Sequence, residues 1–111
     1  MRKTSLQVSS VATSSSRKYK HNIFDIDNSE ILYKLRPVSF LYNSDMNLGN
    51  NKRYGFIAEE VMTIDENLVS IVKEKDEDNI ALYYNSILTL AVAEIQKLRK
   101  ELDELKSNLN I

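Results

Sequence analysis

A repeat of apolar residues near the C-terminal end is the feature that most constrains how this chain can fold. Seven apolar residues recur there at alternating spacings of three and four, at Leu88, Ala91, Ile95, Leu98, Leu102, Leu105 and Leu109. This heptad pattern places one apolar seam along one side of a helix, and such a seam is buried by packing against a second helix. The sequence therefore predicts a long coiled-coil helix over residues 85–110.

Charged residues beside the seam favour a parallel arrangement of identical chains. If Leu88 occupies heptad position a, Glu94 and Glu101 occupy position g, and Arg99 and Lys106 occupy position e. In a parallel coiled coil, a g residue faces the e residue five positions later in the neighbouring chain. The charges therefore predict a parallel homo-oligomer, without separating a dimer from a trimer. The alternative is an amphipathic helix that packs on its own domain.

Upstream of this helix, the pattern indicates an α+β domain made of short strands and helices. Asn28 or Ser29 can cap a short helix, which ends at Pro37. Alternating apolar residues then predict a strand over residues 38–42. A return strand over residues 54–57 would close a hairpin.

Further short elements are expected between this hairpin and the long helix. They are a helix over residues 58–64, a strand over 68–72, a charged turn over 73–79 and a strand over 80–83. Residues 1–16 are rich in serine and threonine. They are typical of an extended lead-in that pairs as an edge strand at most.

The composition excludes several classes of function. The 111 residues include no cysteine and one histidine, so no disulfide framework, metal site or cofactor is expected. The longest apolar run, residues 87–93, is far short of the roughly 20 residues that span a bilayer, so no membrane partner is expected. A net charge of −1 argues against binding of nucleic acid by the whole chain. Five positive charges in the first 24 residues leave a basic nucleic-acid-binding tail as an alternative, which predicts strongly salt-dependent binding.

Serine and lysine lie close together in residues 13–23, the one segment that offers reactive side chains. A serine becomes a nucleophile when a base takes its proton, and a lysine serves as that base when burial or neighbouring cations favour its neutral form. The glycines, Gly49 and Gly55, are isolated and form no phosphate-binding loop.

Four blocks of the sequence resemble the self-cleaving intramolecular chaperone domain found at the C-terminus of phage endosialidases, tailspikes and tail fibres. Residues 15–23 (SSRKYKHNI) are similar to its opening Ser-Asp-x-Arg-Leu-Lys-x-Asn-Ile motif. Residues 35–42 (LRPVSFLY) resemble its Leu-x-Pro-Val-x-Phe-x-Tyr strand, and residues 54–61 (YGFIAEEV) resemble its Gly-Phe-Ile-Ala-Gln-Glu-Val block. Residues 82–84, before the heptad helix, resemble its Val-x-Tyr sequence, and a Leu-Val pair stands at residues 68–69.

The resemblance implies a site and a reaction. It places Ser15 at the position of the self-cleavage serine and Lys20 at that of its lysine partner, so that the chain would be cut between Ser14 and Ser15. The enzyme would be a serine endopeptidase that acts once on its own chain. Ser16 stands where the family has Asp, and Tyr19 stands where it has Leu.

The resemblance also implies an organisation and a role. Residues 1–14 would be the end of an upstream fibre or spike segment, and residues 15–111 the chaperone domain, assembled as a parallel homotrimer. The domain would hold three fibre chains together while they fold and then release itself. This would take place in the host cytoplasm, and the parent protein would belong to the virion tail fibre or spike.

Two rival interpretations remain. One is a trimerisation module of a fibre protein that never cleaves, in which Ser15 and Lys20 have no catalytic role. The other is a membrane-tethered transcription factor, because a eukaryotic regulator carries a similar domain. That second rival needs a DNA-binding domain upstream and a transmembrane segment downstream.

Overall fold

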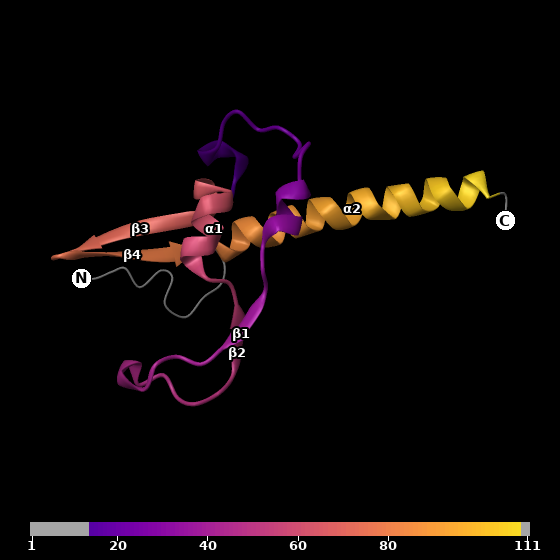
Figure 1. The fold of residues 1–111 in the computed structure, drawn as a ribbon. Coiled ribbons are helices and arrows are strands. Elements are labelled where there is room, and N and C mark those ends of the chain that lie inside the picture. Colours follow the sequence, from indigo (N-terminus) through magenta and orange to yellow (C-terminus); the bar gives the residue numbers. More distant parts are fainter. Residues whose placement is uncertain (1–13, 110–111) are drawn as a thin grey trace.

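The computed structural model describes residues 14–109 and has the predicted α+β class. The elements in chain order are the 3-10 helices η2 (Arg17–Tyr19) and η3 (Glu30–Lys34), strand β1 (Val38–Phe40), the 3-10 helix η4 (Ser44–Met46), strand β2 (Arg53–Gly55), helix α1 (Ala58–Ile64), the 3-10 helix η5 (Glu66–Leu68), strands β3 (Val69–Glu74) and β4 (Glu77–Leu82), and helix α2 (Tyr84–Asn108) (Figure 1). The predictions for residues 1–13 and 110–111 lie outside the described residues.

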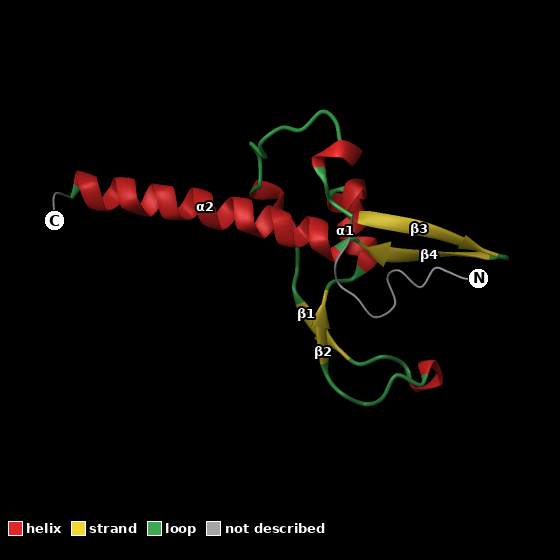
Figure 2. Cartoon of the chain, turned by 180° about the vertical axis from the view of Figure 1, so that it is seen from behind, coloured by secondary structure: helices red, strands yellow, loops and turns green. Residues whose placement is uncertain are grey.

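Helix α2 extends well beyond the other elements, so that its C-terminal half has no element beside it in either view (Figures 1 and 2). The chain measures 60 × 38 × 26 Å, and its radius of gyration is 18.5 Å. A compact chain of this length would have a radius of gyration of about 13 Å. The predicted long helix is confirmed from Tyr84 to Asn108. No helix within residues 14–109 is both long and apolar enough to cross a membrane.

The hydrophobic core is small and lies where α1 meets the first turns of α2. Its five buried apolar side chains come from four separate places in the chain: Leu35, Val61, the adjacent Leu68 and Val69, and Ile87. They join the end of η3, α1, η5, the start of β3 and the base of α2. Many other large apolar side chains of the described residues stay exposed. A single chain therefore buries little of its apolar surface, which leaves much of it available to a partner.

Strands β1 and β2 form the first hairpin, which projects from the body of the domain (Figure 2). Val38 pairs with Gly55, and Phe40 pairs with Arg53. The predicted strands over 38–42 and 54–57 are therefore partly wrong at their ends. Tyr42 leaves the strand and packs its ring edge-on against Phe40, at 5.2 Å between ring centroids. The alternation of apolar residues continues to Tyr42, but the backbone pairing does not.

Strands β3 and β4 form a second antiparallel hairpin, from the pair Val69 and Leu82 to the pair Glu74 and Glu77. The predicted charged turn over residues 73–79 is wrong, because both strands continue through most of it. Lys73 pairs with Asp78 across the strands and forms an ion pair of 3.3 Å. Charge did not end these strands because this part of the hairpin is exposed to solvent and its side chains need no burial.

The short helix predicted after Asn28 is present, as the 3-10 helix η3. Asn28 Oδ1 accepts a hydrogen bond of 3.1 Å from the backbone N–H of Glu30, so Asn28 supplies the polar contact at its start. The side chain of Ser29 makes no capping bond and points elsewhere. The predicted helix over residues 58–64 is confirmed as α1.

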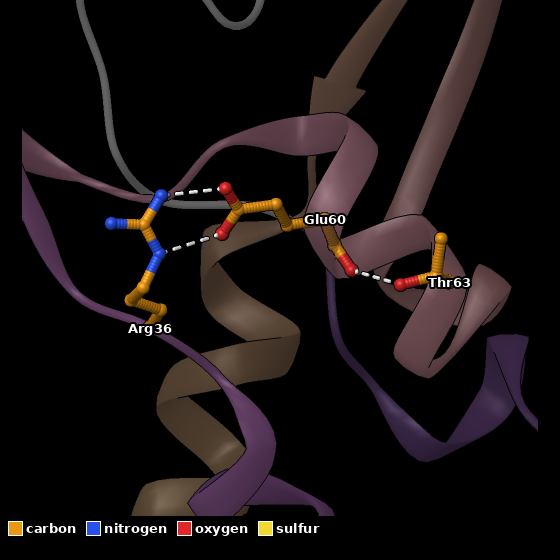
Figure 3. Close-up of polar contacts among 3 residues, drawn as sticks. All are labelled: Arg36, Glu60 and Thr63. Atoms are coloured by element: carbon orange, nitrogen blue, oxygen red, sulfur yellow. Dashed lines mark hydrogen bonds and ion pairs between the residues drawn. The ribbon is translucent and has the colours of Figure 1, made fainter.

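An ion pair connects the entry to β1 with α1 (Figure 3). Arg36 Nε and Nη2 donate to the two carboxylate oxygens of Glu60, at 3.0 and 2.6 Å. This contact, first through its hydrogen bonds, lowers the pKa of Glu60 below its usual value and raises that of Arg36. Thr63 Oγ1 donates to the backbone carbonyl of Glu60 at 2.7 Å. The pair holds together two of the blocks that carried the sequence resemblance.

Candidate functional site

Ser15 and Lys20 are in direct contact. Lys20 Nζ donates a hydrogen bond of 2.5 Å to Ser15 Oγ, and both side chains are exposed. A nucleophile within hydrogen-bonding distance of a base is the geometry that an activated serine requires. Ser14, on the other side of the predicted cleavage point, is also exposed. The two residues predicted from the resemblance therefore lie together within one chain.

The 3-10 turn η2 explains why residues five positions apart meet. The backbone N–H of Tyr19 donates to the carbonyl of Ser16, and that of Lys20 donates to the carbonyl of Arg17, both at 3.0 Å. These bonds fold the chain back so that Lys20 returns beside Ser15. Ser16 Oγ accepts from the N–H of Lys18 at 3.4 Å and caps this turn. A serine is a good substitute for aspartate at such a cap, because both offer a side-chain oxygen to a free N–H.

The predicted apolar seam lies uncovered on α2. Its side chains are exposed except for the half-buried Ala91, the exposed ones being Leu88, Ile95, Leu98, Leu102, Leu105 and Leu109. Exposed leucines in an unbroken heptad pattern are a surface that another helix covers. The alternative in which this seam packs on its own domain is therefore wrong for the described chain.

A different stripe of α2 faces the domain. Ile87 is buried in the core, Leu90 packs against it, and Glu94 follows on the same side of the helix. On a helix of 3.6 residues per turn, this stripe lies roughly a quarter of a turn away from the seam. One face of the helix therefore anchors it to the domain, and another, the seam, is exposed.

Glu94 is committed to bonds within its own chain. It is 3 % exposed. Ser29 Oγ donates to its Oε1 at 2.6 Å, and Tyr33 Oη donates to its Oε2 at 2.5 Å. These hydrogen bonds, first that of Ser29 and then that of Tyr33, lower the pKa of Glu94 against the opposing effect of desolvation. The hydrogen bond between Tyr33 and Glu94 also raises the pKa of Tyr33.

The structure corrects one part of the charge pattern. Glu94 was predicted to pair with Arg99 of a neighbouring chain, but its carboxylate is buried and already bonded. Arg99 instead bonds to Asp103 on its own helix, at 3.4 Å. The sequence contained one indication that Glu94 would be buried, because Glu94 continues the apolar stripe of Ile87 and Leu90. A glutamate in line with core residues is a candidate for burial.

No group of three or more metal-ligating side chains gathers within residues 14–109.

Comparison with known proteins matches the same region. A peptidase family model described as "Chaperone of endosialidase" matches residues 15–70. A protein named "Probable tail fiber protein" from Escherichia phage Phieco32 is 33 % identical over 99 residues, which cover 86 % of this chain. The match covers 13 % of that relative's length, so the chain corresponds to a small part of it.

Proposed function

The chain belongs to the chaperone of endosialidase family, and on that premise we propose that it is the intramolecular chaperone of a phage tail fibre or spike protein. The domain, residues 15–111, brings three fibre chains together as a parallel homotrimer and then cuts itself off between Ser14 and Ser15. Residues 1–14 are the end of the upstream fibre segment. Assembly takes place in the host cytoplasm, and the fibre becomes part of the virion tail.

The observation that carries the self-cleavage is the contact of 2.5 Å between Lys20 Nζ and Ser15 Oγ. In its neutral form, Lys20 accepts the hydroxyl proton while Ser15 Oγ attacks the carbonyl carbon of Ser14. The new C–O bond closes a five-membered ring that contains the nitrogen, Cα, Cβ and Oγ of Ser15. Lys20 then returns the proton to the nitrogen as the C–N bond breaks. The product is an ester between Ser14 and the side chain of Ser15.

Water completes the reaction by hydrolysing this ester. The hydrolysis leaves a carboxylate on Ser14 and restores the hydroxyl of Ser15, which now carries a free amino group. The chain has then consumed its own substrate bond, so each molecule reacts once.

Ser15 and Lys20, which we call the dyad, are both exposed in one chain, and assembly can supply the burial that they lack. Lysine acts as a base in its neutral form, and burial against apolar surface favours that form. A neighbouring copy that covers Lys20 would therefore activate it after the trimer has formed. Cleavage would then follow assembly and indicate that the trimer has formed. Unassembled chains that cut themselves at the full rate would contradict this coupling.

The uncovered seam of α2 supports the trimerising role. Three fibre chains must meet in register, and contacts between distant segments form slowly because loop closure costs entropy first. Helices that associate near the end of the chain raise the effective concentration of the fibre segments. Removal of the helices after folding leaves the fibre kinetically trapped, because chains that unfold can no longer be brought together to refold.

The test combines intact mass spectrometry with light scattering on the freshly made chain. We expect a trimer and a fragment that begins at Ser15, and we expect Ser15→Ala and Lys20→Ala to remain whole. Lys18→Ala is the matched control, since it changes the same residue type as Lys20 beside the dyad and should still be cut.

Each other outcome selects a different conclusion. An uncut trimer in all variants would leave the rival in which the domain is a permanent trimerisation module. An uncut monomer would contradict both roles. A Ser15→Ala chain that is still cut at the same bond would exclude Ser15 as the nucleophile.

A further inference from the structure

A polar cluster around one buried carboxylate joins helix α2 to η3, which follows the segment that carries the dyad (residues 15–28, the dyad segment). Its members are Glu94, Ser29 and Tyr33, which we call the Glu94 latch. Each carboxylate oxygen of Glu94 accepts one hydroxyl, over sequence separations of 65 and 61 residues. Outside the cluster, Lys97 on the next turn of α2 lies 3.5 Å from Glu30. Among the described residues, these are the polar side-chain contacts between the chain before β1 and α2.

The carboxylate of Glu94 is buried, so hydrogen bonds within the protein must satisfy its charge. A charged group away from water is destabilising unless hydrogen bonds satisfy it. Glu94 is buried, and the hydroxyls that satisfy it come from Ser29, just before η3, and from Tyr33 within η3. Segment and helix therefore hold each other in one arrangement, because separation would break both bonds at once.

The latch limits the freedom of the dyad segment. Lys20 lies nine residues before Ser29 and eleven before Ile31, the first residue of η3 that packs against the core. Between the dyad and the latch, Ile26 lies with Thr89 and Leu90 of α2 along a shallow groove. Without the latch, the first contact with the core would be that of Ile31, and the free tether would be longer. The probability that a tethered segment occupies a given position falls with about the 3/2 power of its length, which gives a loss of about 1.4-fold here.

We propose that the Glu94 latch couples α2 to the dyad segment, and that Glu94 is a positioning residue for self-cleavage. This inference rests on the proposed function. Stabilisation of α2 by assembly fixes Glu94, which fixes Ser29 and Tyr33, and so holds the segment that presents Ser15 and Lys20. The latch takes no part in bond making or breaking.

The experiment measures two quantities for the full chain after cell-free synthesis, namely the first-order rate of self-cleavage and the hydrogen-exchange protection of residues 30–34. We expect Glu94→Gln and Tyr33→Phe each to lower the rate at least about 1.4-fold and to reduce protection at η3. The double variant should be no slower than the slower single variant, because both changes break one unit. Glu104→Gln, an exposed glutamate on α2, and Tyr54→Phe on β2 are matched controls that should change neither quantity.

The outcomes separate the latch from the proposed function. Unchanged protection at η3 in Glu94→Gln would overturn the latch. Reduced protection with an unchanged cleavage rate would overturn the positioning role. It would also be overturned if the fold-loss of cleavage rate in the double variant equalled the product of the losses in the two single variants. If the unaltered chain does not cleave, the proposed self-cleavage and the positioning role both fail. Hydrogen exchange alone then decides whether α2 holds η3.

Discussion

Replacement of Ile95 by alanine should weaken assembly strongly while leaving the single domain intact. Ile95 lies at the middle of the seam and is 64 % exposed in one chain. Because alanine favours the helix more than isoleucine does, the change does not weaken α2 itself. Any loss of assembly would therefore come from the apolar surface that the substitution removes.

The size of the effect follows from the exposed area. Full burial of an isoleucine side chain contributes about 1.5–3 kcal/mol. With 64 % of Ile95 exposed, assembly can gain about 1–2 kcal/mol per chain from it. At about 1.4 kcal/mol for each of three chains, the trimerisation constant falls about a thousandfold. Since that constant depends on the square of concentration at the midpoint, the midpoint concentration should rise about 30-fold.

Sedimentation equilibrium over a dilution series would measure this midpoint, on a Ser15→Ala background so that cleavage does not remove the helix. The matched control is Ile71→Ala on β3, which makes the same change at a side chain that is 51 % exposed. Equal shifts in both variants would refute the idea that the seam is the assembly surface. So would an unchanged midpoint in Ile95→Ala.

Three further predictions concern stability. Leu68→Ala in the core, where the side chain is 3 % exposed, should lower the free energy of unfolding by about 2–5 kcal/mol in urea titrations; a loss below 1 kcal/mol would contradict the described core. At Gly55, an added Cβ would lie 2.6 Å from Tyr84 Oη, so Gly55→Ala should cost about 1–3 kcal/mol; Tyr84→Phe in the same chain should restore part of this, and no restoration would place the strain elsewhere. The hydroxyl bonds of Glu94 lower its pKa in the folded state below 4.5, so their contribution is present above pH 4.5 and is lost as the pH falls through the folded value. Urea midpoints measured against pH should therefore fall more steeply in acid for the unaltered chain than for Glu94→Gln, and parallel curves would argue against the bonded carboxylate.

Features set by local spacing could be predicted from the sequence. Helix α1 and the length of α2 could be predicted because their apolar residues recur at helical spacing. Such a pattern depends only on residues that are close together in the sequence. The contact between Ser15 and Lys20 also lies within five residues, and one 3-10 turn is enough to form it. The strand ends were predicted less well, because backbone pairing with a partner strand decides them, and Tyr42 has no such partner within residues 14–109.

The sequence by itself determined the heptad seam, the family motif and the presence of a long helix at the end of the chain. Tertiary structure decided which face of that helix meets the domain and what becomes of Glu94. A heptad pattern assigns Glu94 a position beside the seam, but its charge is satisfied by hydroxyls 61 and 65 residues away in the chain. The ion pair of Arg36 and Glu60 spans 24 residues in the same way. Periodicity describes one element at a time, whereas burial of a charge depends on which distant donors the fold brings to it.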